Sequence, residues 1–179
     1  MLQSAGQGLP YLILDGTLVS ADRCTDKKNQ PERRTDRQMV LGKAHGHAGV
    51  IQGLIAPSGP YGCTWVLPGS THVTAAREQV LPAAGPYLKN PPVLADSGYE
   101  GAGAGVHVPV KRPRKEALDT DTITRNILLR GLRYQGERGF ALLKERWRAL
   151  GHVTADPASI GPIAMAALVL TQIEHKMIS

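Results

Sequence analysis

The stretch PPVLADSGYEGAGAG, residues 91 to 105, constrains the fold most, because an apolar run there ends on one carboxylate, Asp96, and then breaks into glycine. The run predicts a buried strand, and the glycines after it predict a tight turn. An ionised aspartate without a partner is costly to hold near a core. Asp96 is therefore either hydrogen-bonded by the following turn or held for a ligand, and the other elements must decide between these roles.

The remaining elements follow from hydrophobic spacing and from turn residues. Aliphatic and β-branched residues, or short apolar runs around a Pro-Ser-Gly-Pro turn, predict strands at 11–23, 48–59, 61–70, 91–96 and 105–110. Helical spacing predicts helices at 70–85, 121–150 and 157–176. Three strands followed by helix-linked ones predict an α/β fold, a ribonuclease H-like mixed five-stranded sheet flanked by helices.

Composition bounds the size of the core and the kind of partner. The chain has 179 residues, 42% of them hydrophobic, which is enough for one main domain, placed at 11–179 after a short N-terminal segment, 1–10. Residues 24–47 are highly charged and predict a mobile or substrate-facing loop. Lys and Arg outnumber Asp and Glu by 21 to 15, so a polyanionic partner is favoured, nucleic acid first.

Cysteine usage and hydropathy indicate the compartment. Cys24 and Cys63 lie far apart without a CxxC or a His/Cys cluster, so neither a zinc site nor a disulfide framework is indicated. The most apolar segment, IGPIAMAALVLTQI (160–173), is too short and too interrupted to span a bilayer. We expect a soluble cytoplasmic protein, associated with the nucleoid and without a membrane partner.

Three carboxylates can converge in the predicted fold. The first and fourth strands of a ribonuclease H-like sheet are neighbours, so Asp15 and Asp96 can lie side by side. Among the acids of the long helix, Glu137 lies close to one helical face with Arg133 and Lys144. Three carboxylates repel unless cations join them, and oxygen ligands suit Mg²⁺ or Mn²⁺. Two such ions support in-line attack on a phosphodiester, with the two basic residues holding phosphates.

Each of these features also has an ordinary explanation. Asp-Gly pairs form turns, which would account for Asp15, and Asp96 could close an Asx turn before Ser-Gly-Tyr. Glu137 could be a surface residue paired with a nearby arginine. The run KRPRK (111–115) is typical of a solvated basic loop. The conjunction of three acids in strand, strand, helix order favours a site.

The stretches LILDGTLV, VLADSGYEGAG and RYQGERGFALLK resemble the three catalytic motifs of insertion-sequence DDE transposases, the DDE superfamily endonucleases, in the branch that contains the Harbinger-type nucleases. The third motif is the most specific. That group carries Arg, three residues, Glu, six residues and Lys, which Arg133, Glu137 and Lys144 match without a gap. The likeness runs over about residues 11 to 172.

The resemblance implies an enzyme that binds the terminal inverted repeats of its own mobile element, cuts DNA with water, and joins the freed 3′ hydroxyl to target DNA. It implies two Mg²⁺ or Mn²⁺ ions, and a homodimer on DNA. The implied catalytic residues and metal ligands are Asp15, Asp96 and Glu137. The candidate DNA-phosphate contacts are Arg133, Lys144, Lys43 (with His45 and His47), Lys111 and Arg112.

The chain departs from the family pattern at three places. Arg130 stands where the family often has Tyr, and Val73 stands where an acid usually follows the preceding His. Only ten residues precede Tyr11, whereas family members carry an N-terminal helical DNA-recognition region there. We therefore expect a truncated copy, or the second half of a split transposase with a separate recognition polypeptide. The alternatives are an inactive remnant that only binds DNA, and a cellular nuclease of the same fold.

Overall fold

The computed structural model describes residues 9–22, 47–57, 59–68, 91–101, 103, 105–155 and 159–175. Its strands are β1 (Leu12–Ala21), β2 (His47–Ala56), β3 (Gly59–Pro68), β4 (Val93–Leu94), β5 (Val106–His107) and β6 (His152–Val153). Its helices are α4 (Thr120–Arg146) and α5 (Ile160–Glu174), with 3₁₀ turns η3 (Ser97–Tyr99) and η4 (Arg148–Leu150). The predicted helix at 70–85 and the charged loop as far as Gly46 lie outside the described residues.

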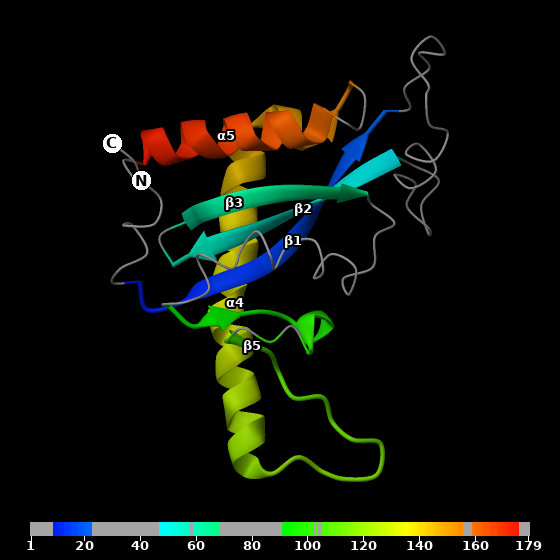
Figure 1. The fold of residues 1–179 in the computed structure, drawn as a ribbon, viewed down its shortest axis with the longest axis vertical. Helices are drawn as coiled ribbons and strands as arrows, with labels where there is room; N and C mark the ends of the chain where they lie inside the picture. Colours follow the sequence, from blue (N-terminus) through cyan, green and yellow to red (C-terminus); the bar gives the residue numbers. More distant parts are fainter. Residues whose placement is uncertain are drawn as a thin grey trace.

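The strands form one mixed sheet in the order β3-β2-β1-β4-β5 (Figure 1). β1, β2 and β3 pair antiparallel, whereas β4 runs parallel to β1 and β5 runs parallel to β4. The predicted ribonuclease H-like mixed sheet is thus confirmed, and so is the adjacency of its first and fourth strands. The short strand β6, which the sequence did not predict, extends the sheet by pairing with the end of β1.

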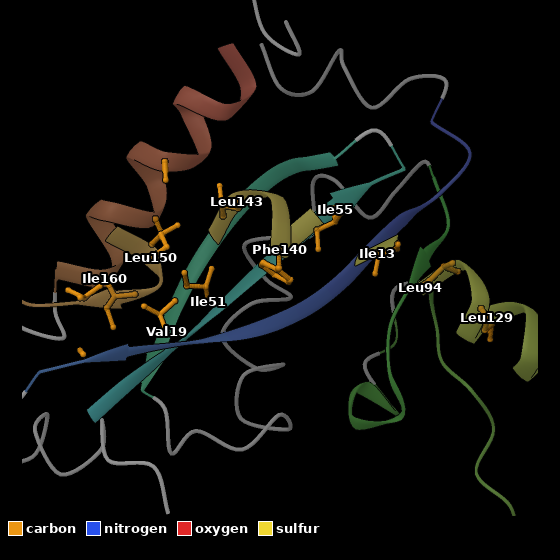
Figure 2. Packing of buried hydrophobic residues seen from close by; sticks show 14 residues of the cluster. Ile13, Val19, Ile51, Ile55, Leu94, Leu129, Phe140, Leu143, Leu150 and Ile160 are labelled. Atoms are coloured by element: carbon orange, nitrogen blue, oxygen red, sulfur yellow. The ribbon is translucent and has the colours of Figure 1, made fainter. Parts of the chain in front are cut away.

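The main core lies between the sheet and the two helices. Successive side chains of a strand point to opposite faces, so every second residue of β1 belongs to one face. On the helix-covered face, Ile13 and Val19 pack in one cluster with Phe140 and Leu143 of α4 and with Ile160 of α5 (Figure 2). The opposite face carries a second buried cluster, formed by Leu12, Leu14, Leu54, Ala56, Val93, Ala95 and Tyr99.

Helix α4 begins at an aspartate cap and ends before the turn η4. The Asp119 carboxylate accepts a hydrogen bond of 2.8 Å from the Thr122 backbone N–H, as an N-cap residue does. The helix was predicted to reach Leu150 but ends at Arg146, because the chain turns through η4 and buries Leu150 in the core. The N-terminal half of α4 extends beyond the sheet (Figure 1).

The C-terminal helix α5 is held against the end of α4 by polar contacts. Trp147 donates its indole N–H to Thr171 Oγ1 at 2.7 Å, and Arg146 contacts both carboxylate oxygens of Glu174 at 3.0 and 3.1 Å. α5 has 15 residues. Across the ranges that the structure describes, no helix has both the length and the apolar character needed to cross a membrane.

Candidate active site

The pairing register places Asp15 and Asp96 at the same level of the sheet. Ile13 of β1 pairs with Leu94 of β4, and each is followed two residues later by an aspartate. Residues two apart in a strand point to the same face, and both Ile13 and Leu94 belong to the core cluster under the helices. Asp15 therefore lies on β1, and Asp96 lies just after the neighbouring parallel strand β4, beside residues of α4.

A glycine on α4 lets the third acid approach Asp15. Gly136 is buried, and a Cβ atom there would lie 2.9 Å from Ile13 Cγ2 and 3.7 Å from Asp15 Oδ2. Any side chain at this position would push the helix away from β1. Glu137 follows directly and lines a cavity of about 390 Å³ together with Asp15, Thr17 and Lys144.

The Asp15 carboxyl group is mostly buried and lies among charges of both signs. Its side chain is 19% exposed. Burial raises the pKa of Asp15, the nearby charges of Asp96 and Glu137 raise it further, and the Gly16 N–H and Arg133 act in the opposite direction. The Gly16 N–H donates to Oδ1 at 2.9 Å, and Arg133 Nη2 lies 3.9 Å from the same oxygen. The ordinary explanation of Asp15 as a turn residue is wrong, because β1 continues through Asp15 to Ala21.

Asp96 has a structural role as well as its place beside Asp15. Its Oδ1 accepts a 2.7 Å hydrogen bond from the Gly98 N–H, which caps the short turn η3. The alternative explanation of Asp96 as a turn-closing residue is therefore correct for one of its two carboxylate oxygens. Asp96 also lines a second cavity, of about 460 Å³, with basic side chains of α4 and of the segment that follows β5.

A buried hydrogen bond supports both aspartates from the opposite face of the sheet. Tyr99, three residues after Asp96, is 2% exposed and donates its hydroxyl to Gln52 Oε1, and Gln52 is 3% exposed. The Gln52 amide lies so close to Gly16 that a Cβ there would be 2.7 Å from Nε2. Burial raises the pKa of Tyr99, and the charges of Asp15 and Asp96 raise it further. Sequence reasoning missed this contact, since its two residues are 47 positions apart.

A comparison with protein families matches the DDE superfamily endonuclease family to residues 14–172. The chain belongs to this family. The match covers most of the chain and includes all three acids, in agreement with the resemblance inferred from the motifs. No curated protein and no solved structure gave a significant match.

The three acids of this member of the DDE family have the donor chemistry of a divalent-metal site but do not converge on one point among the described residues. Within the ranges described, no three His, Cys, Asp or Glu side chains group closely enough to hold a metal ion. Asp15 and Glu137 line the first cavity, and Asp96 lines the second. Carboxylate oxygens suit Mg²⁺ and Mn²⁺, and Asp96 and Glu137 both make ionisation of Asp15 harder, so a cation would stabilise the group.

The two basic residues of the helix motif, Arg133 and Lys144, line different cavities. Arg133 lines the second cavity and reaches Asp15, and its buried Nε atom has no hydrogen-bond partner among the described residues. Lys144 lines the first cavity and donates to the Leu18 carbonyl oxygen at 3.0 Å. Arg133, Glu137 and Lys144 are therefore near Asp15 along one side of α4, as the spacing predicted, but Arg133 does not share the cavity of Glu137 and Lys144.

Of the other candidate DNA contacts, Lys111 and Arg112 lie near Asp96, and Lys43 is not among the described residues. Lys111 and Arg112 line the second cavity, so part of the KRPRK run lies beside Asp96. Lys111 also pairs with Glu100 at 2.7 Å. Lys43 and His45 lie outside the described residues, and His47 begins β2.

Proposed function

We propose that this chain is a transposase-type endonuclease that cuts DNA at the ends of a mobile element and transfers the freed 3′ hydroxyl to target DNA. Family membership supports a nuclease that acts on DNA. The observation that carries the proposal is the placement of three acids from three elements: Asp15 and Glu137 line one cavity, and Asp96 follows the strand that pairs with β1. Burial, and to a smaller degree the charges of Asp96 and Glu137, raise the pKa of Asp15. Groups perturbed in this way concentrate at sites of chemistry.

In this proposal Asp15, Asp96 and Glu137 would hold two Mg²⁺ or Mn²⁺ ions. Bound there, such ions supply Lewis-acid activation of a nucleophilic oxygen and stabilisation of the leaving oxygen. The protein contributes the positions of its donors. The Gly16 N–H orients Asp15, the Gly98 N–H orients Asp96, and the close packing at Gly136 sets the distance of Glu137 from β1.

Arg133 and Lys144 would bind the phosphates that flank the reacting one. Arg133 lies beside Asp15, where its planar guanidinium can contact phosphate oxygens through two N–H groups. Lys144 lines the cavity that contains Asp15 and Glu137. In this proposal the DNA strand passes over the site from Arg133 to Lys144. Residues 11–179 would form the one catalytic domain that carries this site.

A DNA-binding chain without cleavage activity is the second candidate. The Arg133 guanidinium lies 3.9 Å from Asp15, and the acids do not converge on one point within the described ranges. An arginine beside the carboxylate offsets part of the charge that a metal would otherwise neutralise. A cellular nuclease of the same fold would differ from the first proposal only in lacking strand transfer.

The deciding experiment uses end-labelled DNA that carries the flanks of the coding sequence, incubated with the purified chain and Mn²⁺. We expect cleavage at an inverted-repeat end, and none with the Asp96→Asn variant, which keeps an oxygen for the Gly98 N–H. A supercoiled target plasmid in the same reaction separates strand transfer from simple hydrolysis, because only transfer joins the label to the plasmid. Binding of the labelled DNA by wild type and variant, without cuts by either, would instead support the second candidate.

A further inference from the structure

The second cavity beside Asp96 is lined by a concentration of positive charge. Four of its lining side chains are cationic and one is a carboxylate, in a space of about 460 Å³: Lys111, Arg112, Arg130, Arg133 and Asp96. Arg130 and Arg133 lie three positions apart on α4, so they point to neighbouring parts of one helical face. Lys111 is paired with Glu100 and Arg133 lies beside Asp15, and an anion in the cavity would reduce the repulsion among the cationic side chains that line it.

A buried asparagine fixes the basic segment in this position. Asn126 of α4 is 5% exposed. The Val110 N–H donates to Asn126 Oδ1 at 2.9 Å, and Asn126 Nδ2 donates to the Val110 carbonyl oxygen, also at 2.9 Å. Both backbone groups of Val110 are therefore bound to one side chain, which sets the chain direction just before Lys111 and Arg112.

Because of this double hydrogen bond, the start of the KRPRK run is a segment fixed to α4 and not a free basic loop. A free basic loop loses conformational entropy when it binds, whereas a segment already fixed to the helix loses less. The start of the run is held beside α4, and Arg112 and Arg130 line the same cavity. Arginine pairs with phosphate through two parallel N–H groups, and three arginines line the cavity.

We propose that the second cavity binds the phosphodiester backbone of the DNA strand next to the phosphate that reacts at the three acids. Arg130 and Arg112 contact the backbone phosphate, and Asn126 is the positioning residue that sets the place of Arg112. The ligand class rests on the proposed function, because the anion is taken to be the DNA substrate. Arg130, which stands at the departure from the family's usual Tyr, thereby gains a role.

The test measures binding of a short fluorescent duplex to the full chain in EDTA, over a series of salt concentrations. The logarithm of the observed association constant falls linearly with the logarithm of the salt concentration, and the magnitude of this slope decreases by about 0.9 for each duplex phosphate that the protein no longer neutralises. We expect Arg130→Gln to reduce the slope by about one unit. Arg148→Gln is the matched control, since it makes the same charge change on an exposed residue of η4 and should leave the slope unchanged.

A second variant tests the positioning role without changing the charge. Asn126→Leu removes both hydrogen bonds to Val110 and should lower the slope by a similar amount in a chain that still melts cooperatively. If the variant does not fold, Arg112→Gln makes the same test at the contact itself. Equal slopes for Arg130→Gln, Arg148→Gln and the wild type, or no binding by the wild type, would overturn the proposal.

DNA cleavage in Mn²⁺, measured in parallel, distinguishes failure of the proposed endonuclease function from failure of the proposed phosphate site. An uncut substrate together with a slope that depends on Arg130 would reject the endonuclease function and retain the phosphate site. Cleavage that depends on Asp96, together with a slope that does not respond to Arg130, would reject the phosphate site and retain the function.

Discussion

Replacing each of the three glycines of helix α4 by alanine would test how closely this helix packs on the sheet. Glycine in a helix interior is less favourable than alanine, so replacement should stabilise the chain wherever there is room for a methyl group. A Cβ at Gly131 would meet no described atom within 4 Å, whereas a Cβ at Gly139 would lie 2.6 Å from Ile55 Cγ2. At Gly136 the nearest atom, Ile13 Cγ2, would be at 2.9 Å.

The magnitudes follow from two opposing effects. Gly131→Ala should gain the full helix-propensity difference, about 0.8–1.0 kcal/mol. Gly139→Ala gains the same amount but inserts a methyl group into a packed contact between buried residues, which costs about 1–3 kcal/mol. The two variants should therefore differ by about 1–3 kcal/mol, and in a domain of this size each kcal/mol moves Tm by about 2–4 °C.

Urea denaturation of the wild type and of the three alanine variants measures these differences directly, provided that the m-values agree. Gly136→Ala should also lower DNA cleavage by more than its loss of stability explains, because moving α4 away from β1 separates Glu137 from Asp15. If Gly139→Ala and Gly136→Ala stabilise the chain as much as Gly131→Ala does, α4 does not pack closely on the sheet at these two glycines.

Three further predictions concern single side chains of the site. Tyr99→Phe should cost about 1–3 kcal/mol in urea denaturation, since it leaves the buried Gln52 oxygen without its donor, whereas Tyr134→Phe, at a residue 68% exposed, should change little. Asp15→Asn should have a higher Tm than the wild type at pH 7, because burial raises the pKa of Asp15 and ionising this carboxyl group in the folded state costs stability. The difference in Tm should disappear as the pH falls below 3.8, the ordinary pKa of an aspartate, because the group is then protonated in both states. A difference in Tm that stays constant across pH would contradict this explanation. Mg²⁺ or Mn²⁺ should raise the Tm of the wild type and raise that of Glu137→Gln less; a flat titration of the wild type would count against a metal site.

The arrangement of the sheet could be predicted because it depends on features that are local in the sequence. The apolar runs that become β1 and β4 are bounded by turn residues, and these two strands are neighbours in the ribonuclease H-like sheet that the element order predicts. The adjacency of Asp15 and Asp96 follows from that order. β6 could not be predicted, because its two residues, unlike those of β4 and β5, do not lie in an apolar run and form a strand only through their pairing with β1.

The details of the site depend on contacts between distant residues, which spacing does not encode. The hydrogen bonds of Asn126 to Val110 join the helix to a segment 16 residues earlier, and no sequence pattern singles out this asparagine. Helical spacing placed Arg133 near Glu137 correctly. It could not show that Arg133 reaches Asp15 of β1, which requires the close approach of α4 at Gly136.

The charge of Asp15 is the part of the site that folding does not explain. An asparagine at this position would still accept the Gly16 N–H through its side-chain oxygen and would avoid the repulsion from Asp96 and Glu137. The carboxylate therefore adds a cost to the folded state, which the Gly16 N–H offsets in part and a cation would offset further. Arg133 offsets part of it from 3.9 Å, and the geometry leaves the cavity shared by Asp15 and Glu137 as the place where a divalent cation would offset the rest. If Asp15→Asn is more stable in EDTA and loses that advantage in Mg²⁺ or Mn²⁺, the carboxylate binds the ion. If the advantage of Asp15→Asn is the same in both, the carboxylate does not bind a divalent cation.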